Sequence, residues 1–195
     1  MSIESPITEK DNWFAGEDKV IDYYITTSPR VEASATAAQG ATVIAIEPLS
    51  EALADGDKVR FTAAGETGIV ATLTAAAAVG ATSLTVSALG GTIHVGTVGG
   101  KVQDITGWAL EWVLRDGPAG ATALITKTRT ETAEAGISIT DGANGICRVT
   151  IADTDTLTLA PGRSRRYYYT LRRTDEGSEQ VLSFGDAILR RAATR

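Results

Sequence analysis

The sequence GATVIAI at residues 40–46 recurs as GATSLTV at residues 80–86. At the same offset of 40 (80 − 40), Leu49, Leu53 and Gly56 correspond to Leu89, Ile93 and Gly96. A repeat with constant spacing indicates that one supersecondary unit was duplicated. Each copy contains a short run of apolar and β-branched residues, which favours strands. The repeat, residues 40–56 and 80–96, therefore predicts a small duplicated β module.

The sequence on either side of the repeat has a different character, because it is rich in Trp, Tyr and Arg. This change of composition indicates a host domain that the module interrupts. We predict a discontinuous host domain made of residues 1–31 and 102–195. The inserted module takes residues 32–101.

Strand patterns in the flanking segments predict the fold class. Residues 19–27 form one expected strand, ended by Ser28 and Pro29, and residues 108–115 alternate with Trp108 and Trp112 on a single face. Further strands are expected at 123–130, 136–140, 146–152, 165–173 and 180–184, followed by a basic tail over 188–195. Leu159-Ala160-Pro161-Gly162 before Tyr167 is typical of a tyrosine corner. The prediction is an all-β chain, an immunoglobulin-like β-sandwich interrupted by the module.

Charge and hydropathy exclude several classes of function. The chain has 195 residues, a net charge of −6 and a pI near 4.9, which argues against nucleic acid as a partner. No apolar run reaches the roughly 18 residues that a membrane helix needs. Residues 1–10 are polar and contain no apolar signal segment. We therefore expect a protein that is made in the cytoplasm and that has neither a membrane nor a nucleic acid as partner.

The residue types that carry catalysis are scarce. His94 is the only histidine and Cys147 the only cysteine, so a catalytic triad and a histidine-rich metal site are disfavoured. Asp55 and Asp57, like Asp153 and Asp155, place two carboxylates two residues apart, but the further oxygen ligands of a calcium loop are missing. We expect these carboxylates to cap turns. The sequence predicts no catalytic residue, no metal site and no cofactor.

Arginines gather near the end of the chain, against the overall acidic charge. The residues predicted to contact a partner are Arg165, Arg166, Tyr168, Arg172 and Arg173, with Trp13 and Phe14 as an arm that orders on binding. Tyr and Arg are enriched at interface hot spots, and opposite potentials align subunits. This pattern favours a docking surface for an acidic partner or for a neighbouring copy of the chain. The alternative is a solvated strand face.

Three segments carry a family resemblance. They are residues 104–116, DITGWALEWVLRD; residues 156–162, TLTLAPG; and residues 167–177, which follow the pattern Tyr-x-Tyr-x-Leu-x-Arg-Thr-Asp-x-Gly. Together they resemble the N-terminal domains of phage baseplate upper proteins, over about residues 19–27 and 102–187. The repeat is likewise similar to small β modules of phage tail and head proteins. The long module departs from that family, which has a short connection at this position.

The resemblance implies a virion structural protein without catalysis. Its expected role is a tail or baseplate component, an adaptor or scaffold for receptor-binding parts. The partners it implies are other virion proteins, with the chain as a homo-oligomer in a symmetric assembly. A capsid decoration or cement protein is a second hypothesis. A carbohydrate-binding β module is a third, and Trp108 and Trp112 count against it because both are expected in the core.

Overall fold

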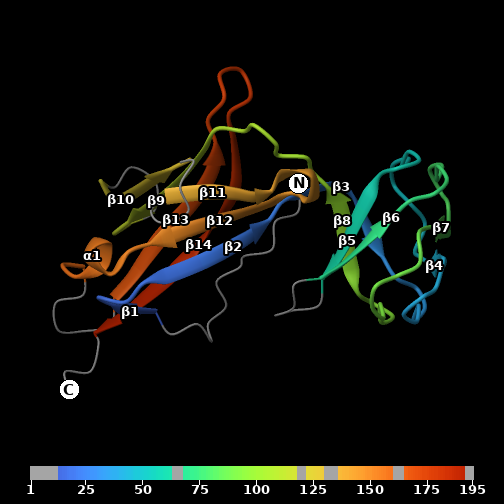
Figure 1. The fold of residues 1–195 in the computed structure, drawn as a ribbon, viewed down its shortest axis with the longest axis horizontal. Helices are drawn as coiled ribbons and strands as arrows, with labels where there is room; N and C mark the ends of the chain where they lie inside the picture. Colours follow the sequence, from blue (N-terminus) through green and yellow to red (C-terminus); the bar gives the residue numbers. More distant parts are fainter. Residues whose placement is uncertain (1–12, 63–67, 118–121, 130–135, 160–164, 192–195) are drawn as a thin grey trace. The chain divides into compact units, whose positions relative to one another are not determined.

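The computed structural model describes residues 13–62, 68–117, 122–129, 136–159 and 165–191 (Figure 1). These residues are almost entirely β, with only the 3-10 turn η1 (Gly142–Asn144) and the four-residue helix α1 (Asp153–Thr156) as helical pieces in the described part. The described chain divides into two compact units, residues 25–103 and residues 13–24 with 104–191. We call them the module and the sandwich. The predicted Pro161-Gly162 corner and the outer parts of the arm and tail lie outside the described residues.

The sandwich consists of two sheets. The five-stranded sheet has the order β1 (Trp13–Ala15), β14 (Gln180–Arg191), β13 (Arg165–Arg173), β9 (Leu110–Arg115) and β10 (Ala123–Thr128). The three-stranded sheet has the order β11 (Gly136–Asp141), β12 (Ile146–Ile151) and β2 (Lys19–Tyr24). Strand β13 between β9 and β14, and β12 between β11 and β2, give the Greek-key order of an immunoglobulin-like sandwich. The predicted fold class is confirmed.

Four aromatic side chains form the centre of the sandwich. Trp112 is fully buried, its ring stacks on Tyr169 at 6.2 Å, and its Nε1 donates a hydrogen bond of 2.9 Å to the Tyr23 hydroxyl. Trp13 packs against Trp112 at a centroid distance of 6.4 Å. These contacts join β1, β2, β9 and β13, so aromatic packing holds the two sheets together.

Trp108 is the exception to the predicted alternation of β9. The strand begins at Leu110, and Trp108 lies before it, half-buried, with the Arg173 guanidinium 4.1 Å above its ring. The prediction that both tryptophans are core residues was therefore wrong for Trp108. Its indole forms a cation–π contact at the margin of the sheet instead.

The tyrosine corner is present. The hydroxyl of Tyr167, at the start of β13, donates a hydrogen bond to the carbonyl oxygen of Leu159, eight residues earlier. Tyr167 is buried on the inner face of its sheet, so this bond anchors the connection that crosses from α1 to β13.

Replacing Tyr167 with phenylalanine is expected to lower the free energy of unfolding by about 1 kcal/mol, because a part-buried carbonyl loses its donor while the ring is retained. Urea unfolding followed by tryptophan fluorescence measures the loss. The matched control is Tyr168→Phe, since Tyr168 points to the opposite face and should be neutral. Equal effects of both variants would contradict a role for the corner.

The module contains two further sheets. The four-stranded sheet has the order β3 (Thr26–Glu32), β8 (Val98–Val102), β5 (Lys58–Thr62) and β6 (Ile69–Thr72), and the two-stranded sheet pairs β4 (Val43–Ala45) with β7 (Ser83–Thr85). The predicted single strand over residues 19–27 is in fact two strands in different units. Pro29 does not end β3, because β3 is an edge strand and its register shifts between Thr27 and Arg30, where a proline is tolerated. The predicted boundary between residues 31 and 32 therefore cuts β3.

The two repeats of the module are related by a local twofold axis. Ile44 pairs with Leu84 and Arg60 pairs with Gly100, and in both pairs the partners are repeat equivalents (84 − 44 = 40; 100 − 60 = 40). Antiparallel pairing of equivalent residues places them on a twofold axis. The bridge Ala37–Ile93 corresponds to the bridge Leu53–Ala77, because the same offset of 40 relates residue 37 to 77 and residue 53 to 93. The strands of one repeat (β3, β4 and β5) therefore pair with strands of the other (β6, β7 and β8), while the bridges Ala33–Ile46 and Leu73–Val86 join residues within one repeat.

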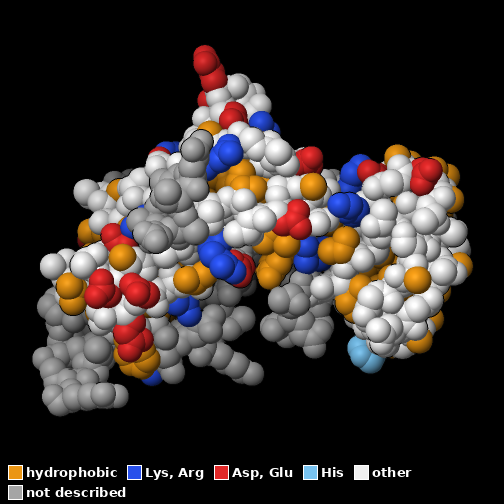
Figure 2. Space-filling view, in the orientation of Figure 1, with side chains coloured by type: hydrophobic (Ala, Val, Ile, Leu, Met, Phe, Trp, Pro, Cys, Tyr) orange, Lys and Arg blue, Asp and Glu red, His pale blue; other side chains and the backbone are white. Residues whose placement is uncertain are grey.

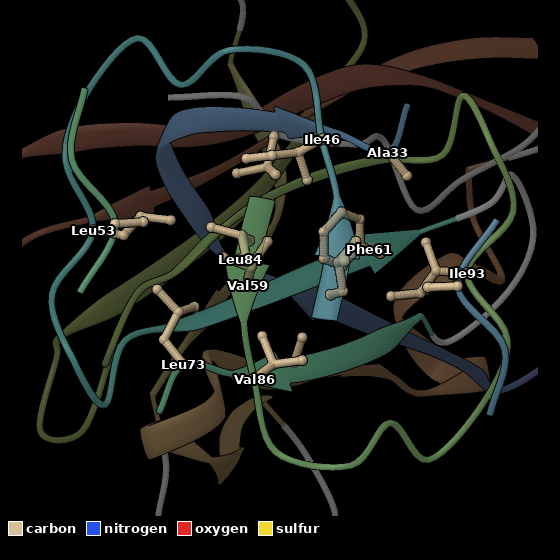
Figure 3. Packing of buried hydrophobic residues seen from close by; sticks show 14 of the residues in the cluster. Ala33, Ile46, Leu53, Val59, Phe61, Leu73, Leu84, Val86 and Ile93 are labelled. Carbon is tan, nitrogen blue, oxygen red and sulfur yellow. The ribbon is translucent and has the colours of Figure 1, made fainter. Parts of the chain in front are cut away.

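The module has a hydrophobic core of its own. Its members come from both repeats and include Ile44, Leu53, Phe61, Leu84 and Ile93. Figure 3 shows the side chains of Leu53, Phe61, Leu84 and Ile93 pointing toward a common centre. Glycines recur at the turn positions 40/80 and 56/96, all with φ near +80°, a conformation that side chains other than glycine rarely adopt. The residues that the repeats share are thus mainly those that fill the core or turn the chain.

The two ends of the module lie side by side. Thr26 pairs with Val102, and the Gln103 amide donates a hydrogen bond of 3.1 Å to the Ile25 carbonyl. Within the sandwich, Tyr24 pairs with Ile146, and the Ile105 amide bonds to the Gly142 carbonyl. The chain thus leaves and re-enters the sandwich at the β11–β12 hairpin. This arrangement explains how a long insertion between β2 and β9 leaves the sandwich topology intact.

Candidate interaction surface

One face of the five-stranded sheet carries exposed apolar side chains. Because successive residues of a strand point to opposite sides, Arg166, Tyr168, Thr170 and Arg172 of β13 point away from the core. Their neighbours on β14 are Val181, Phe184, Asp186 and Ile188. We call these eight residues the outer β13–β14 face. Phe184 is 76% exposed, Val181 52% and Ile188 42%, so the face carries an apolar stripe along β14.

The arginines of this face are already paired. Arg172 Nη2 lies 2.6 Å from Glu111 Oε1 on β9, and Arg166 Nη1 lies 3.5 Å from Asp186 Oδ2 on β14. Both pairs are at least partly exposed, so each contributes little to folding stability. The effect of these pairs is electrostatic, because each of the two arginines lies beside a carboxylate that balances its charge.

Two of the predicted contact residues lie apart from this face. Arg165 points to the inner side of β13, 3.6 Å from Asp116 and with its guanidinium 5.6 Å from the centre of the Tyr167 ring. Arg173 covers Trp108 and forms an ion pair of 2.6 Å with Asp175. Of the predicted set, the fold brings together only Arg166, Tyr168 and Arg172. Whether they contact a partner stays a prediction.

Trp13, predicted to belong to an arm that orders on binding, is instead a core residue of the sandwich. Trp13 is only 2% exposed and packs on Trp112, because β1 pairs in parallel with the end of β14. Its side chain fills the sandwich core and is not displayed to a partner. Phe14, the next residue, points the other way and is half-buried.

Sequence reasoning missed the apolar stripe on β14. Val181 and Phe184 are three residues apart, so strict alternation would place them on opposite faces. A register shift between Leu171 and Arg172 inserts an extra residue on β14, and both side chains then point outward. The predicted tail at Ile188 is instead part of β14, which continues to Arg191 because β1 pairs with it. The run QVLSFGDAIL was the available signal.

A hollow of about 360 Å³ adjoins the stripe where the β13–β14 hairpin projects (Figure 1). Its lining consists of Arg172, Arg173, Thr174, Glu179, Gln180 and Val181. The hollow extends the outer β13–β14 face toward the hairpin. Within this lining, Arg172 is paired with Glu111 and Arg173 with Asp175.

The ion pair at this hairpin gives the protein an acid-sensitive contact. A hydrogen bond from Arg173, followed by one from the Ala109 amide, lowers the pKa of Asp175 below its usual 3.8. A carboxylate with a lowered pKa stabilises the fold above the unfolded-state pKa, and this stabilisation is lost as the pH falls through the folded-state value.

We expect Asp175→Asn to lower the melting temperature above pH 3.8, and we expect this difference from wild type to shrink and disappear as the pH falls through the lower folded-state pKa of Asp175. Melting curves from neutral pH to well below 3.8 measure the difference. Glu176→Gln, a neutral substitution at the exposed next position, is the control. A constant gap between Asp175→Asn and wild type at all pH values would show that the carboxylate charge is not responsible.

The structure shows where the residues considered for catalysis and metal binding lie. Cys147 is fully buried in β12, and burial raises the pKa of its thiol to about 12. His94 is exposed in a turn of the module (Figure 2, pale blue). Asp57 accepts a hydrogen bond of 2.8 Å from the Ala54 amide, and Asp155 accepts one of 2.8 Å from the Ala152 amide. These two carboxylates cap turns, as expected.

Acidic and basic side chains are interspersed on the face shown in Figure 2. Among the described residues, no group of three His, Cys, Asp or Glu side chains is placed to hold a metal ion. No helix in the described part of the chain is long and apolar enough to span a membrane. Comparisons of the chain with models of protein families, with curated proteins and with solved structures found no significant match.

Proposed function

We propose that this protein is a non-enzymatic structural component of a bacteriophage virion, an adaptor or scaffold of the tail or baseplate that supports receptor-binding parts. The observation that carries the proposal is the outer β13–β14 face. A row of Phe184, Val181 and Ile188 stands exposed on a sheet of a rigid sandwich, beside Tyr168 and two arginines. Aromatic residues and arginine surrounded by polar side chains are the usual composition of protein–protein contact regions.

The mechanism of this function is assembly. The aromatic core holds the sandwich rigid, so the outer β13–β14 face is displayed to other virion proteins without ordering cost. The module supplies a second surface, separated in sequence from the first, on which another virion protein docks. The resemblance of residues 104–116 and 167–177 to baseplate upper proteins supports a place in the tail. The protein is made in the host cytoplasm and resides in the virion.

Particles purified from the producing cells test this proposal. Quantitative mass spectrometry should find the chain in fixed ratio to other virion proteins, and immunogold labelling should place it at the tail end. Labelling over the head surface would move the assignment to a decoration or cement protein. Absence of the chain from purified particles would overturn the proposal.

The same particles test the surface. Phe184→Asp should reduce incorporation of the protein, because it puts a charge at the most exposed apolar position of the stripe. The control is Val20→Asp, which introduces the same charge at a 50% exposed valine on the other sheet. Normal incorporation of Phe184→Asp would mean that another surface mediates assembly.

A further inference from the structure

Basic side chains gather at one end of the outer side of the five-stranded sheet. Arg166 of β13 points outward, and Arg115 points the same way because it is the cross-strand partner of Tyr168. Arg190 follows Asp186 by four residues on β14 and therefore shares this side. Arg166 lies beside Asp186, whereas neither Arg115 nor Arg190 forms an ion pair with a described residue. We call these three arginines and Asp186 the basic end, with a net charge of +2 (3 − 1 = 2).

The hairpin that joins β13 to β14 carries the opposite charge. Asp175, Glu176 and Glu179 lie in it, and both glutamates are exposed. Asp175 is paired with Arg173, but within the described chain neither glutamate forms an ion pair. We call residues 173–179 the acidic hairpin, with a net charge of −2 (1 − 3 = −2). The hairpin projects from the sandwich, and Figure 2 shows acidic side chains at its tip.

The basic end and the acidic hairpin lie at opposite ends of the same two strands. β13 has nine residues, which span about 30 Å at roughly 3.3 Å per residue. Charges this far apart do not neutralise each other within one molecule, because the Debye length in physiological salt is about 8 Å. Each copy of the chain therefore presents one surface of each sign, and the two surfaces are complementary.

We infer that the partner of the basic end is the acidic hairpin of a second copy of this chain, in a head-to-tail contact. Glu176 and Glu179 of one copy then face Arg115 and Arg190 of the next, so charges that lack a described partner within the molecule gain one across the contact. A contact between two different surfaces generates rings or filaments. This inference rests on the proposed function, because it names the partner of part of the same surface.

Exposed apolar side chains beside the basic end supply the attraction. Ile188 is the cross-strand neighbour of Arg166, and Phe184 pairs with Thr170 further along β14. Ile188 is 42% exposed and Phe184 76%, so a neighbour laid along β14 removes apolar surface from water. Exposed ion pairs contribute little affinity by themselves. The charges therefore determine which surfaces meet, and burial of the apolar side chains holds them together.

Charge reversal in the full-length protein tests this inference, with analytical ultracentrifugation from about 1 µM to about 1 mM as the measurement. The wild type should form oligomers larger than a dimer. These should dissociate as salt is raised from about 0.05 M to about 0.5 M, because salt screens exposed charges. One double variant is Arg115→Glu with Arg190→Glu, and the other is Glu176→Lys with Glu179→Lys. Each should weaken assembly by about thirtyfold or more, because like charges then face one another.

An equimolar mixture of the two double variants separates a self-contact from binding of a foreign acidic protein. In the mixture the unchanged hairpin of one variant meets the unchanged basic end of the other, and the two reversed surfaces also match. Assembly should therefore return, which no foreign partner explains. The matched control is Glu47→Lys with Glu51→Lys, at exposed positions of the module, and it should assemble as the wild type does. Circular dichroism checks that all variants are folded.

Three outcomes would overturn the inference. They are a wild type that stays a monomer or stops at a dimer, unchanged assembly of either double variant, and a mixture that does not assemble. If the wild type is monomeric and the double arginine variant is lost from particles, the basic end binds a different virion protein and the proposed function stands. If the mixture assembles but the chain is absent from particles, the inference holds and the proposed function fails.

Discussion

Replacing Trp112 with alanine is expected to lower the free energy of unfolding of the sandwich by about 3–5 kcal/mol, the range for removing a buried aromatic side chain. Trp112 is fully buried between the two sheets, and its ring is stacked on Tyr169. The substitution leaves a cavity and also removes the indole donor of the Tyr23 hydroxyl, which is itself buried. Small domains are stable by only about 5–15 kcal/mol, so the sandwich should be close to unfolding.

Urea unfolding followed by fluorescence measures this effect in the sandwich alone. All tryptophans and tyrosines lie outside residues 25–103, so the aromatic signal does not report on the module. Trp108→Ala is the matched control, since Trp108 is half-buried at the sheet margin and should cost much less. Equal losses for the two variants would contradict the assignment of Trp112 as the central core residue.

Replacing Gly99 with alanine is expected to destabilise the module by about 1–3 kcal/mol, the usual cost of overpacking. A Cβ atom at this position would lie 2.6 Å from the Arg60 carbonyl oxygen and 3.1 Å from the Phe61 ring. Gly99 is the cross-strand partner of Phe61, close to the local twofold axis. A Cβ atom at residue 99 would therefore force the β5 backbone and the Phe61 ring to move.

Far-UV circular dichroism reports on both units, whereas fluorescence reports on the sandwich. Gly99→Ala should therefore shift part of the dichroism transition to lower urea and leave the fluorescence midpoint unchanged. Gly90→Ala is the control, because no atom lies within 4 Å of its added Cβ and its φ is not positive. An unchanged dichroism transition for Gly99→Ala would show that the β5–β8 pair tolerates a larger residue there.

Local patterns predicted the strands whose sequences alternate or are bounded by turn residues. The strand over residues 165–173 was predicted with the bounds that β13 has. The strands that were missed have weak local signals. β8 contains Gly99 and Gly100, which disfavour a strand until Phe61 and Thr26 pack over them. β1 is only three residues long and exists because β14 pairs with it.

The candidate surface was predicted in part. Arg166, Tyr168 and Arg172, three of the predicted contact residues, share the outer face of β13, as strand alternation requires. Their acidic partners come from β9 and β14, far away in the sequence, so the matched charges could not be foreseen. The burial of Trp13 depends on the same long-range pairing.

The sequence by itself determined the all-β class and the repeat at a constant offset of 40, because periodicity, turn residues and repeats are local properties of a chain. Only the tertiary structure decided that strands of the two repeats pair about a twofold axis, that Trp13 belongs to the core, and that Phe184 stands exposed among paired charges. Each of these depends on which strands lie side by side. Strand pairing is set by the packing of the whole chain, and a single segment does not encode it.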